Sequence, residues 1–288
     1  MKPPAALPPL ARVVLGLLLL VTTGTALFML PGMATTGLLT WNQALFTAAS
    51  ALSVTGLSLV VPSRDLTPLG QGVLLLLIQV GGVGFMVGAV AVYELIGRRV
   101  SLRNRLALTD SLGLLSPKNI LRLTRQVLIG VLATEALGAL ILFLNWRGRL
   151  DSDSQAAFYA IFHAISAFCN AGFDLFSGRP DFPAGLPTDS VTLITLGGLI
   201  ILGGLGIPVL MDFVGYRGRE RLSLHTRLTL WAVAVLNLMG TLAFFAEEWF
   251  GGGVLQGVDP IRGLSLSAFQ IAAARTAGFW AVADPTQI

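Results

Sequence analysis

The stretch SVTGLSLVVP, residues 53–62, combines the Thr and Gly of a tight turn with bulky apolar residues, and it lies between two long apolar segments. Two similar stretches follow it, CNAGFDLF at residues 169–176 and RTAGFWAV at residues 275–282. In each stretch a Gly is followed directly by a bulky apolar residue. This recurrence indicates that one structural unit is repeated along the chain.

The composition is that of a membrane protein. Of the 288 residues, 54% are hydrophobic and 12% are charged, whereas a soluble domain has about 25% charged residues. Much of the surface is therefore expected to face lipid. The single cysteine, Cys169, excludes an internal disulfide and a cysteine-based zinc or redox cluster. We expect it to be a small buried hydrophobic residue.

The apolar segments fall into two length classes. Segments of about 20 residues can span a bilayer, and five are present: 10–30, 69–96, 128–146, 191–214 and 228–246. Three shorter segments lie between them, at 42–54, 155–169 and 264–274, and their length suits re-entrant or buried helices. The first segment could also be a signal peptide. Its length, and the recurrence of Gly24-Thr25 as Gly240-Thr241, favour a span.

The distribution of charge predicts the orientation in the membrane. Residues 97–126 hold seven Lys and Arg against one Asp, and residues 212–227 hold four Arg. By the positive-inside rule both loops are cytoplasmic, as is the N-terminus with Lys2 and Arg12. The short segments must then enter and leave the membrane on the outer side. Because the basic loops flank spans and lack interleaved aromatic residues, a nucleic-acid partner is not expected.

The internal repeat extends beyond the turns. The short segments read ALFTAASALSVTGL, AIFHAISAFCNAGF and SAFQIAAARTAGF, and the two spans that follow the first two read LIQVGGVGFM and LIILGGLGIPVL. Twenty residues after the first Gly of each of these spans come SLRNRLAL and SLHTRLTL. We interpret each unit as a span, a short re-entrant helix, a Gly turn and a second span.

The predicted fold is an all-α polytopic membrane protein with repeated helix–re-entrant pore loop–helix units, two complete and the third partial. The predicted divisions are a first unit at 1–96, a basic cytoplasmic linker at 97–126, a second unit at 127–214, a second basic linker at 215–227, and a partial third unit at 228–288 that stops after its turn.

The Gly turns have a chemical interpretation. A backbone loop at membrane depth must line a water-filled path or be buried in protein. Carbonyl oxygens of such loops can replace the hydration shell of a cation, and Gly allows the unusual backbone angles. The C-terminal end of each short helix adds partial negative charge. We expect Leu57, Phe173 and Phe279 to pack behind the loops. The alternative, ordinary turns between hydrophobic helices, does not explain three copies at one position of a repeat.

The motifs SVTGL, LLIQVGGVGFM, FHAISAFCNAGFDLF, LGGLGIPVLMD, LSLHTRLTL and ARTAGF resemble those of the Trk/Ktr/HKT superfamily of potassium transporters, with the KtrB-type membrane subunits most similar. The resemblance runs over residues 10–285. It implies a four-unit potassium-channel-like fold, in which four covalently joined units surround one pore and each contributes one filter loop. In this sequence the implied filter residues are Val54, Thr55, Gly56, Leu57, Asn170, Ala171, Gly172, Phe173, Thr276, Ala277, Gly278 and Phe279.

The resemblance also implies ions and partners. In this family, Gly at the filter positions is associated with potassium selectivity, and Ser in the first loop is associated with sodium-favouring plant members. The first loop of this sequence has Gly, at position 56 (Gly56). Relatives work with a cytosolic ring of nucleotide-binding RCK subunits and form membrane homodimers. The basic inner loops are candidates for contacting such a ring. K⁺ is the expected transported ion, Na⁺ is a candidate coupling ion, and no cofactor is expected in this chain.

The sequence departs from the family pattern in one respect. It contains three filter loops where the family has four. The second span of the third unit, which carries the family's gate segment, and the fourth unit, with a basic residue that helps to close the pore, do not occur in it. A partial sequence is the simplest expectation, and the chain as written is not expected to form a closed pore by itself.

Four polar residues lie near these segments, and two of them, Glu135 and Asp174, have two interpretations each. Glu135 is an intramembrane carboxylate, either functional or hydrogen-bonded to a neighbouring helix. Arg275 adjoins the third turn and is expected to face away, bonding the loop backbone or a carboxylate. Asp174 follows the second turn and either concentrates cations or is a solvated loop residue. His163 is expected to be a packed histidine. The Gly81-Gly82 and Gly203-Gly204 pairs suit close helix packing or bending around a pore.

The predicted function is potassium uptake across the bacterial cytoplasmic membrane through a filter of backbone carbonyls, driven by the membrane potential with Na⁺ as a candidate coupling ion. An enzyme is not expected, because H-E-x-x-H and G-x-S-x-G motifs do not occur. The alternative is a secondary transporter of another small cation or solute that uses broken-helix sites. That alternative predicts that Gly56→Ser leaves Na⁺/K⁺ discrimination unchanged.

Overall fold

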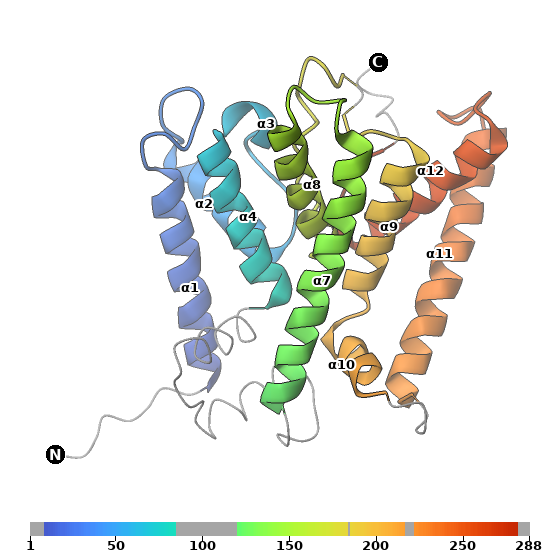
Figure 1. Ribbon diagram of the computed structural model, residues 1–288, viewed down its shortest axis with the longest axis horizontal. Helices are drawn as coiled ribbons and strands as arrows, with labels where there is room; N and C mark the ends of the chain where they lie inside the picture. The colour runs from blue at the N-terminus through green and yellow to red at the C-terminus, as the bar shows by residue number, and fades with distance from the viewer. Residues whose placement is uncertain (1–8, 85–119, 184, 217–221, 282–288) are drawn as a thin grey trace.

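The computed structural model describes residues 9–84, 120–183, 185–216 and 222–281, and the regular elements in these ranges are helices (Figure 1). The expected all-helical fold is confirmed there. The elements in chain order are α1 (Pro9–Phe28), α2 (Trp41–Ser53), α3 (Pro62–Asp65), α4 (Pro68–Val83), α7 (Ile120–Trp146), α8 (Asp153–Phe168), α9 (Ser190–Gly204), α10 (Ile207–Gly215), α11 (Leu224–Phe250), α12 (Pro260–Ala272) and the π-helix η1 (Ala273–Ala277).

The longer helices run roughly side by side, and the short helices α2, α8 and α12 lie between them in the upper half of Figure 1. In the described residues two helices, α7 and α11, are long and apolar enough to cross a membrane, and the bent pair α9–α10 makes a third if it is one span. The apolar parts of α1 and α4 are shorter. Most of the expected basic linkers, and the N-terminal eight residues, lie outside the described ranges, so their side of the membrane stays a prediction.

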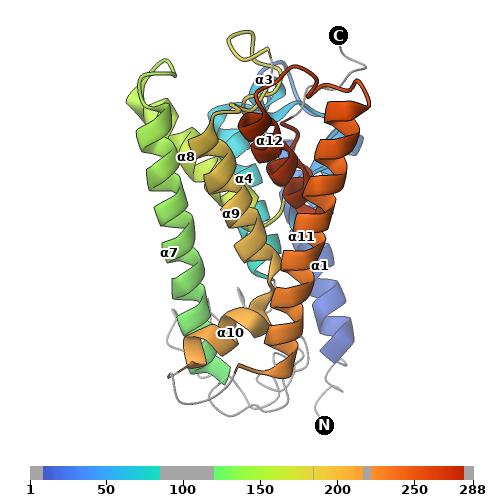
Figure 2. The same ribbon diagram turned by 90° about the vertical axis from the view of Figure 1, so that its right-hand side faces the viewer.

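The expected span at 191–214 is bent, as one of the two interpretations of its Gly203-Gly204 pair predicts. Its residues form two helices, Ser190–Gly204 and Ile207–Val214, that meet at an angle of 93° (Figure 2). Between them Gly206 has φ +84°. Pro208 in the first turn of α10 has no backbone N–H that could donate a helical hydrogen bond back to α9. Likewise α4 ends at Val83, before Gly84 with φ +88°. The rest of the expected span 69–96 lies outside the described residues.

The helix contacts recur along the chain. Gly24 of α1 packs against Leu77 of α4, and Gly138 of α7 packs against Leu199 of α9 at the same relative position. A Cβ on Gly81 would overlap the carbonyl oxygen of Leu52 at the end of α2, and a Cβ on Gly203 would overlap that of Phe168 at the end of α8. Small residues therefore allow the last helix of the first and of the second predicted unit to touch the end of its short helix.

The short helices begin at polar caps. The side chain of Thr40 caps α2 in a capping box with Gln43, the Ser152 side chain caps α8, and the Asp259 side chain caps α12. The large buried side chains gather where α7, α8 and α9 meet; they include Trp146, Phe162, Phe173 and Phe176. By contrast α11 exposes a long apolar surface, as expected for a helix that faces lipid.

Candidate functional site

The first two Gly turns share one backbone geometry at the ends of α2 and α8. Val54 and Asn170 have left-handed φ values of +57° and +59°. The N–H of Thr55 donates to Ser50 O at 3.0 Å, and the N–H of Ala171 donates to Ser166 O at 2.8 Å. These are the six-to-one bonds of a Schellman cap. A left-handed Val is a backbone outlier, because its branched Cβ crowds the main chain.

The third turn closes in a different way. Helix α12 continues into the π-helix η1, and the left-handed residue is Gly278 itself, with φ +67°. Its N–H donates to Ala273 O at 2.8 Å. The resulting one-residue shift in the closing bond was not predicted, since π-turns have no simple sequence signal. In all three turns a short helix ends at a loop that carries a Gly with positive φ.

The three loops lie against one another in chain order. A Cβ on Gly56 would overlap the carbonyl oxygen of Ala171, and a Cβ on Gly172 would overlap that of Ala277. Both glycines also have positive φ, +75° and +71°. Glycine is therefore required at each of these positions for two reasons, the positive φ angle and the close approach of a neighbouring carbonyl group. In the described part of the chain, a Cβ on Gly278 would meet no atom within 4 Å.

Side chains also tie the loops in place. The Thr276 hydroxyl donates to Asn170 Oδ1 at 2.8 Å and so joins the second loop to the third. The Ser50 and Thr55 hydroxyls are 2.8 Å apart, and Ser166 Oγ donates to Phe173 O at 2.8 Å. The sequence analysis did not single out these serines. Their shared position in the repeat, six residues before the Gly of the first and second turns, was an available signal.

The packing behind the loops is as expected in two of three cases. Phe173 and Phe279 are each 2% exposed, and both belong to the core. Leu57 is 65% exposed, so the expectation that it packs behind its loop is wrong in this structure. The described part of the chain leaves most of Leu57 uncovered, whereas Phe173 is followed by the buried Leu175 and Phe176.

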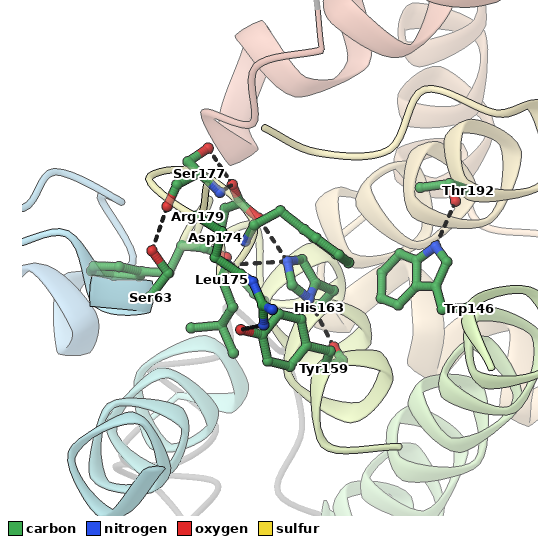
Figure 3. A network of polar contacts seen from close by, with 12 residues as sticks. Ser63, Trp146, Tyr159, His163, Asp174, Leu175, Ser177, Arg179 and Thr192 are labelled. Carbon is green, nitrogen blue, oxygen red and sulfur yellow. Dashed lines mark hydrogen bonds and ion pairs between the residues drawn. The ribbon is translucent and has the colours of Figure 1, made fainter. Parts of the chain in front are cut away.

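Figure 3 shows a polar network that anchors the chain after the second loop. His163 is fully buried; its Nδ1 lies 2.7 Å from Tyr159 O and its Nε2 lies 2.8 Å from Asp174 Oδ1. Asp174 also accepts hydrogen bonds from the N–H groups of Phe176 and Ser177, at 2.8 Å each. Ser63 Oγ donates to Ser177 O and so connects α3 to this loop.

These contacts decide the roles of two singled-out residues. His163 is the packed histidine that we expected. Asp174 is neither a solvated residue nor an acid open to passing cations, because its side chain is only 13% exposed and its oxygens are taken up by protein donors. Burial would raise the pKa of Asp174, but the hydrogen bonds and charge of His163, together with the Ser177 and Phe176 bonds, lower it below its usual value.

The remaining polar residues lie behind the loops. Glu135 accepts hydrogen bonds from Gln79 Nε2 of α4, as its hydrogen-bonding interpretation predicts. Cys169 is buried, as expected. The guanidinium of Arg275 lies against Gly204 at the end of α9. Within the described residues no hydrogen bond or ion pair of Arg275 is found, so the expected bond to loop backbone or carboxylate is not observed there.

Comparison with known proteins adds the family context. A family model described as TrkH, cation transport protein, matches residues 22–286. The chain is 36% identical over 265 residues to Ktr system potassium uptake protein B of Bacillus subtilis (strain 168), covering 92% of this chain and 58% of that protein. It is 37% identical over 263 residues to the protein of the same name from Vibrio alginolyticus, covering 91% and 56%.

A third relative carries a different name. The chain is 30% identical over 277 residues to potassium/sodium uptake protein NtpJ of Enterococcus hirae, covering 96% of this chain and 60% of that protein. The chain thus spans less than two thirds of the length of these curated relatives.

Proposed function

Because the chain belongs to the TrkH family of cation transport proteins, we propose that it forms part of a potassium uptake pore in the bacterial cytoplasmic membrane. Family membership makes it a membrane transport protein and not an enzyme. The specific ion, the path and the partners are our proposals, because the relatives that match are longer than this chain.

The observation that carries the proposal is the stacking of the glycine loops. Gly56 lies against the carbonyl group of Ala171, and Gly172 lies against that of Ala277, so the three loops follow one another closely. We propose that the backbone of residues 54–57, 170–173 and 276–279 lines the ion path and coordinates K⁺ through carbonyl oxygens. The C-terminal ends of α2 and α8, and η1 after α12, bring partial negative charge to these loops.

The same stacking rule supports a fourth loop. Each of the first two glycines lies against the Ala carbonyl of the next loop, whereas Gly278 has open space beside it in the described residues. Leu57 of the first loop is exposed as well. We propose that a fourth loop, from this or another chain, fits between the third and the first, so that four units of helix, re-entrant pore loop and helix surround one pore.

The proposed partners and ions follow the family resemblance. We propose a homodimer of membrane subunits and a cytosolic RCK-type ring that contacts the basic linkers at 97–126 and 215–227. Two relatives are named for potassium uptake and a third for potassium/sodium uptake. We therefore propose K⁺ as the transported ion and Na⁺ as a candidate coupling ion.

The test is growth of a potassium-uptake-deficient bacterium at low potassium. The full-length protein is expressed together with its cytosolic partner, and its presence in the membrane is checked. We expect growth to be restored by the wild type and not by Gly172→Ala. Absence of rescue by the wild type, with both proteins present, would show that the proposed function is wrong.

A second candidate function rests on the broken helix. The 93° bend between α9 and α10 is the kind of interruption that forms substrate sites in secondary transporters. In that case another small cation or solute is carried at the bend, and the glycine loops are structural. This alternative predicts that Gly56→Ser leaves Na⁺/K⁺ discrimination unchanged, whereas a carbonyl filter predicts that the discrimination falls.

A further inference from the structure

A cluster of three polar side chains lies behind the second loop, between α4, α7 and α8. Gln79 Nε2 of α4 donates to both carboxyl oxygens of Glu135 in α7, at 3.1 and 3.3 Å. Cys169 Sγ, at the end of α8, lies 3.9 Å from Glu135 Oε1. The cluster joins the predicted first unit to the second, and the proposed ion path does not use it.

Among the residues that the structure describes, the surroundings of Glu135 offer no positive charge. Its side chain is 4% exposed and lies within the apolar span Arg125–Trp146. In the described ranges no Lys, Arg or His nitrogen lies within 4.0 Å of its oxygens. The groups that face the Glu135 carboxyl are the neutral Gln79 amide from α4 and the Cys169 thiol from α8. One turn further along α7, Gly138 contacts the apolar Leu199 of α9. An ionised carboxylate left unpaired in such a place costs several kcal/mol.

The unpartnered amide oxygen of Gln79 points the same way. As placed, Gln79 Oε1 is buried and has no partner among the described residues. The side-chain amide of Gln79 can rotate so that both of its ends face Glu135. A protonated carboxyl group then donates its O–H to Gln79 Oε1, and Gln79 Nε2 donates to the other carboxyl oxygen. An ionised carboxylate has no proton to donate and leaves the amide oxygen unsatisfied.

We infer that Glu135 is a proton-binding site, holding a proton that it shares with Gln79 in a paired carboxyl–carboxamide contact. A cavity of about 110 Å³ lies beside the cluster, and its lining includes Val131, Cys169 and Gly82. Val131 lies one helical turn before Glu135 on α7. The cavity therefore reaches within one helical turn of the carboxyl group along α7.

The site is connected to the second loop. Cys169 is followed directly by Asn170, and a Cβ on Gly82 would overlap the Cys169 sulfur, so α4, α7 and the end of α8 are in direct contact here. Loss of the proton places a negative charge beside the C-terminal end of α8, where the helix dipole is already negative. This repulsion loosens the packing behind the loop. Given the proposed function, potassium uptake then falls as the pH rises into the alkaline range.

Infrared spectroscopy of the purified full-length protein tests the proton directly, without reference to transport. At neutral pH the wild type is expected to show the carbonyl stretch of a buried protonated carboxylic acid, sensitive to deuterium exchange, and E135Q is expected to lack it. E247Q, at an exposed position of α11, is the matched control and keeps the band. If the wild-type and E135Q spectra do not differ in this region, Glu135 is ionised and the inference is wrong.

A transport measurement then tests the consequence. Uptake of K⁺ by proteoliposomes containing the full-length protein is followed from neutral to alkaline pH. Wild type and E247Q are expected to lose uptake at alkaline pH, whereas E135Q, which resembles the protonated state, has a flat profile. An E135Q protein that folds but shows no uptake at neutral pH would overturn the inference. If the wild type takes up no K⁺ at all, the proposed function fails, and the infrared result still decides the proton site.

Discussion

At the scale of single residues, the glycines of the loops carry the strictest requirement. A Cβ on Gly56 would overlap a backbone carbonyl, which cannot move aside like a flexible side chain, and the residue has φ +75°. We expect Gly56→Ala to lower potassium uptake at least about tenfold, equivalent to about 1.4 kcal/mol. Gly72→Ala in α4 is the matched control, because a Cβ there meets nothing within 4 Å in the described residues. Comparable uptake by the two variants would show that the close approach at Gly56 is not required.

Val54 is a position where a substitution should stabilise the protein. Its φ of +57° is unfavourable for a branched side chain, and the equivalent residue of the second loop is Asn170, a residue type that tolerates this region. We expect Val54→Asn to raise the free energy of unfolding by about 1 kcal/mol. Thermal unfolding of the full-length protein in detergent, with Val61→Asn as a control at negative φ, measures it. A lowered melting temperature for Val54→Asn would argue that Val54 is not strained.

At the scale of elements, the N-terminus of α9 depends on the charge of Asp189. Its side chain accepts bonds from the Thr192 N–H and hydroxyl, Asn145 and Arg149. Burial would raise the pKa of Asp189, but these bonds lower it. A lowered folded-state pKa means that the stabilisation is present above the unfolded-state pKa, about 3.9, and is lost as the pH falls through the folded-state pKa.

We therefore expect the wild type to lose thermal stability as the pH falls below about 4. Asp189→Asn keeps a residue that can cap the helix but removes the titrating group, so its stability should depend less steeply on pH in this range. Melting temperatures measured from pH 7 downward test this. Parallel profiles for the two proteins would assign the acid sensitivity to other groups, such as Asp174.

The contact between α7 and α9 depends on a buried tryptophan. Trp146 is almost fully buried, and its Nε1 donates to Thr192 Oγ1 at 2.9 Å (Figure 3). Trp146→Phe removes this bond and leaves a small cavity, and we expect a loss of about 2–4 kcal/mol in the free energy of unfolding. Trp231→Phe, at an exposed position of α11, is the control and should have little effect. Equal melting temperatures would contradict the packing described between α7 and α9.

At the scale of the whole molecule, the proposed fourth loop can be tested through Gly278. In the described residues a Cβ on Gly278 meets nothing within 4 Å, unlike a Cβ on Gly172. If a fourth loop closes the ring, its carbonyl group should lie against Gly278 as Ala277 lies against Gly172. We then expect Gly278→Ala and Gly172→Ala to lower uptake by the full-length protein equally. Clearly higher uptake by Gly278→Ala would indicate that no backbone approaches that side of the third loop.

Much of this architecture could be predicted from the sequence, because the repeat places similar residues at similar positions. The expected short segments became α2, α8 and α12, and the Gly pairs became close helix contacts. The bend after Gly204 was one of two interpretations of the Gly203-Gly204 pair, and the sequence could not decide between them because a positive φ at Gly206 depends on the surrounding structure. The left-handed Val54 and the burial of Asp174 have no local sequence signal, because long-range packing imposes them.

The central claim is that the backbone of the glycine loops selects potassium. The most direct test is the ratio of K⁺ to Na⁺ initial uptake rates in proteoliposomes containing the full-length protein, for the wild type and for Gly56→Ser. We predict that the wild type prefers K⁺ and that Gly56→Ser lowers the ratio by at least about tenfold, or about 1.4 kcal/mol. An unchanged ratio, with the variant present and active in the membrane, would contradict a filter at Gly56 and favour a carrier that binds its substrate elsewhere.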